Sequence, residues 1–199
     1  MLRWGVVFQQ ATLQTDQLPK FEDSKFVCNQ FDGKKQVVAS VKRSQSEEGI
    51  NNTIDAETCV CLNLEDLKCF EVVEHQYEHW GVILQNSVAI QPSNPAFPTN
   101  SGLTVLMGAP KSGFLEAKFL RPVSQVSACV TSSQRLVMSA YDRDRQLVAQ
   151  SILPSANLAN SDSALHPNTS LSVTNQNICS VSFCAFDGQF TISAFCFCV

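Results

Sequence analysis

The segment ICSVSFCAFDGQFTISAFCFCV, residues 178–199, decides the fold that we expect for this chain. Two apolar, β-prone runs flank Asp187-Gly188, and an Asp-Gly pair between such runs is a strong signal for a β-hairpin. The apolar phase shifts in the second run, because the residues up to Ile192 share one face and those from Phe195 lie an odd step away. A bulge at Ser193-Ala194 would return both sets to one side. The segment therefore predicts two paired core strands.

Short apolar runs separated by turn residues continue upstream to residue 58. In FLEAKFL, residues 114–120, apolar residues alternate with Glu116 and Lys118, which predicts a strand with one wet and one dry face. The stretch RLVMSAYDRDRQLVAQSIL, residues 135–153, reads as a hairpin with a solvated charged turn at 142–145. We therefore expect an all-β fold over residues 58–199, a two-sheet antiparallel β-sandwich of jelly-roll-like architecture.

Residues 1–57 differ from the rest and are expected to form an N-terminal extension. Asp32-Gly33 lies between two β-prone runs and predicts a further hairpin. Residues 44–57 are polar and rich in turn formers, which indicates a linker or exposed loop before the sandwich domain.

Composition narrows the classes of partner. The chain has 199 residues, 44% of them hydrophobic and 16% charged, with a net charge of -4. Nucleic-acid binding needs a basic field, so we expect no nucleic-acid partner. No apolar run reaches the roughly 18 residues of a membrane span, and WGVVF near the start is too short for a signal-peptide core. We therefore expect a cytoplasmic chain, or an extracellular one if the natural N-terminus is longer.

Nine cysteines occur, and four of them form two C-x-C pairs, CVC at 59–61 and CFC at 196–198. Residues i and i+2 of a strand face the same side, so neighbouring first and last strands would bring four sulfurs together as disulfides or as a zinc site. The simpler interpretation is that the cysteines are small buried hydrophobic residues with reduced thiols. Both interpretations stay open at this point.

Five stretches in order carry a resemblance to a known family: LNLEDL (62–67), QYEHWGVIL (76–84), FLRPVSQVSACVTS (119–132), YDRDRQLVAQ (141–150) and VSFCAFDGQFTISAFCF (181–197). The order resembles the β-sandwich module of exported cyanobacterial proteins that carry Pro-Glu-Pro C-terminal sorting signals. That architecture is similar to jelly-roll and galactose-binding-like carbohydrate modules.

The resemblance also implies a structural calcium site. Carboxylates on the first and last strands of such modules hold the ion, and Glu65 and Asp66 match the opening half. Ser193, with Ala194, stands where the closing carboxylates would be, which weakens the site. The alternative is that Glu65 and Asp66 begin a solvated turn.

The stretch EHQYEHW, residues 74–80, contains the H-x-x-E-H pattern of inverted zinc proteases in His75, Glu78 and His79. The pattern works on a helix, and the spacing here predicts one short helical turn ending at Gly81. No later helix offers a third ligand, so we expect solvent-facing histidines, with Tyr77 and Trp80 capping the end of the sandwich.

Our leading hypothesis is a non-catalytic module that binds a ligand, a glycan above all, or a protein. Tyr77, Trp80, Asn94 and Phe97 are the candidate binding residues, because loop aromatics stack on sugar rings. For Phe97 the alternative is a ring tucked over the sheet edge. A metal-dependent hydrolase using the H-x-x-E-H stretch and a structural module that self-associates through the Asp32-Gly33 hairpin are the rival hypotheses.

Overall fold

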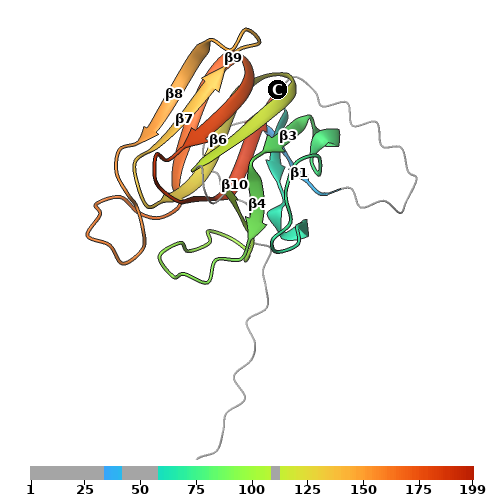
Figure 1. The fold of residues 1–199 in the computed structure, drawn as a ribbon. Coiled ribbons are helices and arrows are strands. Elements are labelled where there is room, and N and C mark those ends of the chain that lie inside the picture. Colours follow the sequence, from blue (N-terminus) through green and yellow to red (C-terminus); the bar gives the residue numbers. More distant parts are fainter. Residues whose placement is uncertain (1–33, 42–57, 109–112) are drawn as a thin grey trace, which may run out of the picture.

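The computed structural model describes residues 34–41, 58–108 and 113–199, which form a layered, all-β structure (Figure 1). These residues contain two short 3-10 helices, no α-helix, and no helix long and apolar enough to cross a membrane. The helices are η1 (Leu64–Asp66) and η2 (Glu78–Trp80). The strands are β1 (Lys35–Ala39), β2 (Thr58–Leu62), β3 (Val82–Gln85), β4 (Ser87–Ile90), β5 (Val105–Gly108), β6 (Phe114–Ser132), β7 (Leu136–Tyr141), β8 (Leu147–Leu153), β9 (Thr169–Cys184) and β10 (Phe190–Cys198).

The strands form one hydrogen-bonded sheet that folds over itself into two layers, which confirms the expected sandwich. The main order is β1-β2-β10-β6-β9-β7-β8, with β3 on β6 and the β4-β5 pair on β10. The long strands β6 and β9 serve both layers: the first half of β6 pairs with β3, and its second half pairs with β10. Phe183 of β9 lies against Phe190 and Phe195 of β10 in the core between the layers.

The chain turns where the sequence predicts, but the expected C-terminal hairpin is wrong, because β9 and β10 do not pair with each other. The long strand β6 lies between them and pairs with β9 along one edge and with β10 along the other. The chain turns between β9 and β10 at Asp187, which has a left-handed φ of 54°. The register of β10 against β6 shifts between Ile192 and Ala194, so the bulge at Ser193 is confirmed. The bulge brings Phe190 and Phe195 into the same core.

The lengths of three strands depend on more than their local apolar runs. Residues 82–90 form two strands rather than one, because Asn86 adopts a left-handed φ of 56° and turns the chain. The runs 114–120 and 123–130 form one strand, β6, with an irregularity between Lys118 and Val123. The runs at 169 and 178 likewise join as β9. Both β6 and β9 continue past the irregular register because the two strands pair with each other on either side of it.

Glu116 does not lie on a wet face, which corrects the expected alternation in FLEAKFL. Its side chain is 7% exposed and forms ion pairs with Arg145 and, at 3.9 Å, with Lys118. Arg145 belongs to the charged turn that we expected to be simply solvated. A buried carboxylate is tolerated when it is paired, so the turn between β7 and β8 supplies what Glu116 needs.

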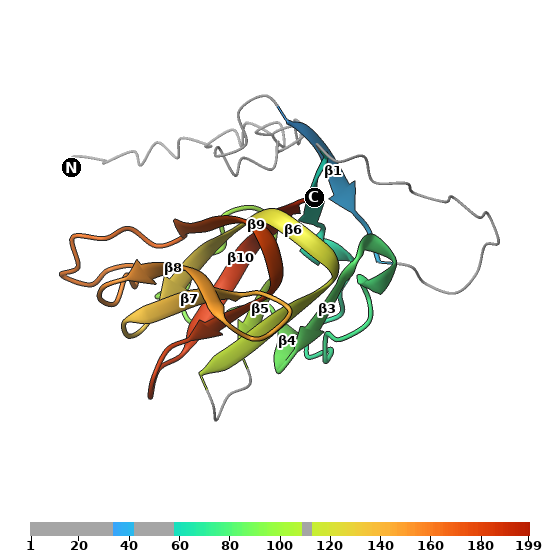
Figure 2. The same cartoon turned by 90° about the horizontal axis from the view of Figure 1, so that it is seen from above.

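The described part of the N-terminal extension joins the sandwich. β1 pairs with β2 in parallel, whereas we expected a wholly antiparallel structure, and Figure 2 shows it beside the C-terminal end of the chain. The hairpin at Asp32-Gly33 and the linker at 44–57 lie outside the described residues. The boundary at residue 57 and the jelly-roll connection of the strands stay predictions.

The two C-x-C pairs bond to each other, which decides between the two open interpretations in favour of disulfides for these four residues. Cys59 is linked to Cys198 and Cys61 to Cys196. β2 and β10 are antiparallel neighbours in a register that sets each pair of cysteines directly opposite. The interpretation of the cysteines as buried residues is also wrong for Cys69 and Cys184, which are exposed.

Candidate functional site

His79 of the H-x-x-E-H stretch and the next residue, Trp80, contact the chain directly after β1. His75 Nδ1 lies 3.0 Å from Glu78 Oε2, whereas His79 Nε2 lies 3.1 Å from the carbonyl oxygen of Ser40. Trp80 Nε1 donates to the same carbonyl at 3.0 Å. Over residues 34–41, 58–108 and 113–199, no three His, Cys, Asp or Glu side chains gather where they could hold a metal ion. The predicted helical turn and its end at Gly81, with φ 95°, are confirmed.

Tyr77 is fully buried, so the structure does not offer it to a ligand. Its hydroxyl donates to the carbonyl oxygen of Asn63 at 2.7 Å. Burial raises the pKa of Tyr77 above its ordinary value, and the negative charges of Asp66 and Glu71 raise it further. Tyr77 therefore acts as a neutral hydrogen-bond donor inside the core, and Trp80 is half-buried beside Ser40.

The three residues of the expected calcium site have separate partners. Glu65 Oε1 accepts hydrogen bonds from the backbone nitrogens of Leu103 and Thr104, both at 2.9 Å. Asp66 Oδ2 accepts from the nitrogen of Val41 at 3.2 Å. The Ser193 hydroxyl donates to Asn168 Oδ1 at 2.6 Å. These contacts tie loops together, and the calcium site stays a prediction from the resemblance.

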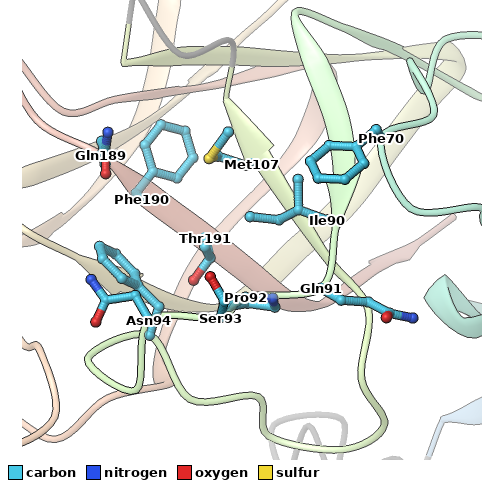
Figure 3. Close-up of a pocket in the computed structure, with 11 residues that line it drawn as sticks. Phe70, Ile90, Gln91, Pro92, Ser93, Asn94, Met107, Gln189, Phe190 and Thr191 are labelled. Carbon is cyan, nitrogen blue, oxygen red and sulfur yellow. The ribbon is translucent and has the colours of Figure 1, made fainter.

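A pocket of about 240 Å³ lies where the 67–71 turn, the segment after β4 and the start of β10 meet (Figure 3). We call it the Phe70 pocket. It contains two of the predicted binding residues, Asn94 and Phe97, and nine others that the sequence did not indicate. The lining residues are Phe70, Ile90, Gln91, Pro92, Ser93, Asn94, Phe97, Met107, Gln189, Phe190 and Thr191.

Phe70 is the most unusual of these residues. Its ring is 80% exposed, and its φ of 64° lies in the left-handed region. The nitrogen of Glu71 donates to the carbonyl oxygen of Lys68 at 3.0 Å, so Phe70 is the third residue of a tight turn. That position with positive φ is normally occupied by Gly or Asn, and a bulky side chain there is strained. Exposure of such a ring identifies Phe70 as a candidate contact residue.

Hydrogen bonds hold the Phe70 turn rigidly against the sheet. The Phe70 nitrogen donates to the Ala89 carbonyl at 2.7 Å, and the Ala89 nitrogen donates to the Glu71 carbonyl at 2.8 Å. The Glu71 carboxylate accepts from the Lys68 nitrogen at 2.8 Å and from Gln76 Nε2 at 2.9 Å. The ring is therefore held at the mouth of the pocket before any ligand arrives.

The opposite wall is a loop fixed by its neighbours. Asn94 Oδ1 accepts from the Ala96 nitrogen at 3.0 Å, which leaves its amide Nδ2 without a hydrogen bond among the described residues. Phe97 is buried at the inner side, in agreement with the alternative of a tucked ring. Asn168 Nδ2 donates to the Pro98 carbonyl at 3.0 Å and holds the loop from behind.

The chemistry of the Phe70 pocket is neutral. None of the described residues that line it carries an ionisable side chain. Aromatic and aliphatic groups form the floor and one rim, and the amides of Gln91, Asn94 and Gln189 provide donors and acceptors. Such a surface suits a neutral ligand that has both apolar faces and hydroxyl groups.

No signal in the sequence could have singled out Phe70. Its importance comes from a backbone angle and from exposure, neither of which shows as periodicity. Gln189 and Met107 enter the pocket because β5 pairs with β10, a contact between residues about 85 positions apart.

Comparison with known proteins adds little. No protein-family model matches the sequence, and no curated protein is significantly similar to it. Among solved structures, TmCBM61 in complex with beta-1,4-galactotriose has 7% identity and a TM-score of 0.32, over 58% of this chain and 82% of that one. The CBM22-1-GH10 modules of Clostridium thermocellum xylanase 10B with xylohexaose have 11% identity and a TM-score of 0.35, over 66% of this chain and 27% of that one.

Both TM-scores are too low to carry an argument about this chain. The fold and the pocket themselves define the class: an all-β sandwich with a rigid, uncharged surface pocket that has an exposed aromatic rim. The resemblance to the cyanobacterial modules stays a prediction.

Proposed function

We propose that this protein is a non-catalytic module that binds a neutral glycan in the Phe70 pocket. The observation that carries the proposal is the exposed Phe70 ring, fixed in a strained conformation beside a pocket without ionisable side chains. Residues in a strained conformation are frequent at binding sites. Such a conformation costs free energy and persists only because the surrounding structure stabilises it.

A sugar ring matches the three kinds of surface in the pocket. Its axial C–H face packs on an aromatic ring, as Phe70 offers at the rim. Its hydroxyl groups pair with carboxamides, and Asn94 Nδ2 is a donor that none of the described residues uses. The volume of about 240 Å³ accommodates a single sugar unit and leaves the rest of a chain at the surface.

The same residues favour binding over catalysis. Glycoside hydrolysis requires a pair of carboxyl groups flanking the scissile bond. The part of the chain that the structure describes places neither a carboxyl group nor a histidine in the Phe70 pocket that could activate the hydroxyl of Ser93 or Thr191.

A glycan array followed by calorimetry tests the proposal. We expect the protein to bind neutral oligosaccharides, and Phe70→Ala to weaken that binding about tenfold, which corresponds to about 1.4 kcal/mol. Asn94→Ala should weaken it as well, because an amide donor to a sugar hydroxyl is lost.

Phe186→Ala is the matched control. Phe186 is 89% exposed but does not line the pocket, so its removal should leave the affinity unchanged. An array on which no neutral glycan binds, or equal affinity of Phe70→Ala and the unsubstituted protein, would show that the proposal is wrong.

We further propose that the protein functions in an oxidising compartment, in place of the cytoplasm expected from its N-terminal residues. Two disulfides between the C-x-C pairs support this location, because such bonds form and persist mainly outside the reducing cytosol. Thiol counting on protein isolated without reductant, with Cys59, Cys61, Cys196 and Cys198 unreactive, is the expected result. Alkylation of these four thiols in the native protein would contradict it.

A further inference from the structure

A second pocket lies where β6 leaves its regular pairing with β9. Lys118 pairs with Ser180 and Val123 with Ile178, so residues 119–122 of β6 stand opposite Cys179 alone. Leu120, Arg121 and Pro122 are exposed, whereas Phe119 stays in the core, and the Leu120 nitrogen donates to the Gly81 carbonyl at 2.9 Å. This irregularity opens a hollow of about 270 Å³, which we call the basic pocket.

The turn between β7 and β8 closes one side of the basic pocket. Asp142 Oδ1 accepts from the nitrogens of Asp144 and Gln146, at 3.0 and 2.9 Å, so this carboxylate stabilises the turn itself. Arg145 has a left-handed φ of 61°, which directs its side chain back over the sheet. Its guanidinium lies 5.0 Å from the centre of the Tyr141 ring and donates to Ser180 Oγ at 3.1 Å.

Positive charge is in excess here. Lys118, Arg143 and Arg145 line the basic pocket, together with one carboxylate, Asp142. Behind them the buried carboxylate of Glu116 is shared between Arg145 and Lys118. Three cationic side chains therefore face two carboxylates, in a chain whose net charge is -4. The Phe70 pocket, in contrast, has no charged lining residue.

We infer that the basic pocket binds an oxyanion, a carboxylate or a sulfate or phosphate ester, carried by a small molecule. Lys118 and Arg143 are the exposed cations that contact it, and the Glu116–Arg145 pair fixes the wall beside them. The hydroxyl of Ser180 adds a neutral hydrogen-bonding group. This site is independent of the neutral glycan site proposed above.

Cys179 provides a direct readout, because its half-buried thiol lines the basic pocket. Its thiolate displaces iodide from iodoacetate or iodoacetamide, forming a carbon–sulfur bond with loss of I⁻. The two reagents are similar in size and differ in charge. Cys69 and Cys184 are exposed outside the pocket and serve as internal controls when each site is quantified by mass spectrometry.

We expect the rate ratio of iodoacetate to iodoacetamide to be several-fold higher at Cys179 than at Cys69 and Cys184. Lys118→Gln with Arg143→Gln should bring the ratio at Cys179 down to that of the controls. Arg135→Gln removes an exposed cation outside the pocket and should leave it unchanged. Arg145 is kept in all variants, because its loss would leave Glu116 buried beside Lys118 alone.

Protection by ligands distinguishes the source of the oxyanion. Glucuronate and sulfate should both slow alkylation at Cys179, whereas glucose should not. Stronger protection by glucuronate indicates a carboxylated sugar, and stronger protection by sulfate indicates a sulfate or phosphate ester. The inference is wrong if neither anion protects Cys179, or if its rate ratio equals that of the exposed cysteines.

Discussion

At the scale of single residues, Phe70 is a candidate binding residue that no local sequence pattern marks. Nothing in FEVVEHQYEHWG marks its first residue, yet the fold places this ring in a left-handed turn position and leaves it 80% exposed. The two backbone hydrogen bonds to Ala89 hold it there. Because only a residue without a Cβ would remove the strain, stability alone does not favour phenylalanine at this position.

Phe70→Gly is therefore expected to stabilise the fold and to weaken glycan binding about tenfold, as Phe70→Ala does. Glycine adopts positive φ without steric strain, and the exposed ring contributes little burial, so we expect a gain of about 1 kcal/mol in the free energy of unfolding. Urea denaturation measures the gain, and calorimetry with the glycan from the array measures the loss.

Asn86→Gly is the control for this substitution. Asn86 also has positive φ, but asparagine tolerates that conformation, so the stability should change little. If Phe70→Gly is less stable than the unsubstituted protein, the ring contributes to folding and the strain argument fails.

Tyr77 gives the alkaline limit of stability. Its pKa lies above the ordinary 10.0, first because of burial, so the folded chain keeps the hydroxyl proton where the unfolded chain releases it. The unfolded state therefore binds fewer protons above pH 10, and the stability that is fully present below pH 10 is lost as the pH rises.

Tyr77→Phe should remove this contribution to the pH dependence, because phenylalanine has no proton to release. At neutral pH the variant loses the hydrogen bond to the Asn63 carbonyl and about 1 kcal/mol of stability. Above pH 10 the difference in the free energy of unfolding between the variant and the unsubstituted protein should become smaller. Urea unfolding at neutral pH and above pH 10 measures this difference. Parallel loss of stability in both proteins would assign the alkaline transition to other groups.

At the scale of elements, β6 is the strand that organises the molecule. Its irregularity after Lys118 lets it pair with β3 in one layer and with β10 in the other, and it opens the basic pocket. The Glu116–Arg145 ion pair then links β6 to the turn between β7 and β8. The buried carboxylate of Glu116 on β6 is thus paired with Arg145, which the sequence places in a solvated turn.

We expect Arg145→Leu to cost more stability than the double variant Glu116→Leu with Arg145→Leu. Removing the guanidinium leaves the buried Glu116 carboxylate with only Lys118 nearby, at a cost of about 2–4 kcal/mol, whereas removing both charges avoids it. Denaturant unfolding of both variants and of Glu116→Leu completes the cycle. A double variant less stable than Arg145→Leu would show that the pair itself stabilises the fold.

At the scale of the whole molecule, the disulfides join β2 to β10 across most of the described chain. The bonds span 139 and 135 residues, and each alone closes a long loop. Once one bond is present, however, the other closes only a ring of a few residues between Cys59 and Cys61 and their partners. In the chain-entropy model, the second bond therefore adds little.

We predict a strongly non-additive result. Replacing Cys59 and Cys198 by alanine, or Cys61 and Cys196, should each cost roughly 1 kcal/mol, whereas replacing all four should cost about 4–5 kcal/mol from loop entropy. Cys129→Ala, in the same buried cluster, measures the packing loss without removing a disulfide. Equal and additive costs for the two bonds would contradict this account.

The sequence by itself determined the all-β class, the turn at Asp187, the bulge at Ser193 and the helical turn that ends at Gly81, whereas the pairing of the two C-terminal strands with β6 was not predicted. These features follow from alternation, turn residues and phase shifts within a few neighbouring positions. It also indicated Asn94 and Phe97, because loop residues near the end of a strand are frequent in pockets. Only the tertiary structure decided the partners of the cysteines, the burial of Glu116 and Tyr77, the strained conformation of Phe70 and the existence of both pockets. Each of these depends on register between strands far apart in the chain, which local residue patterns do not encode.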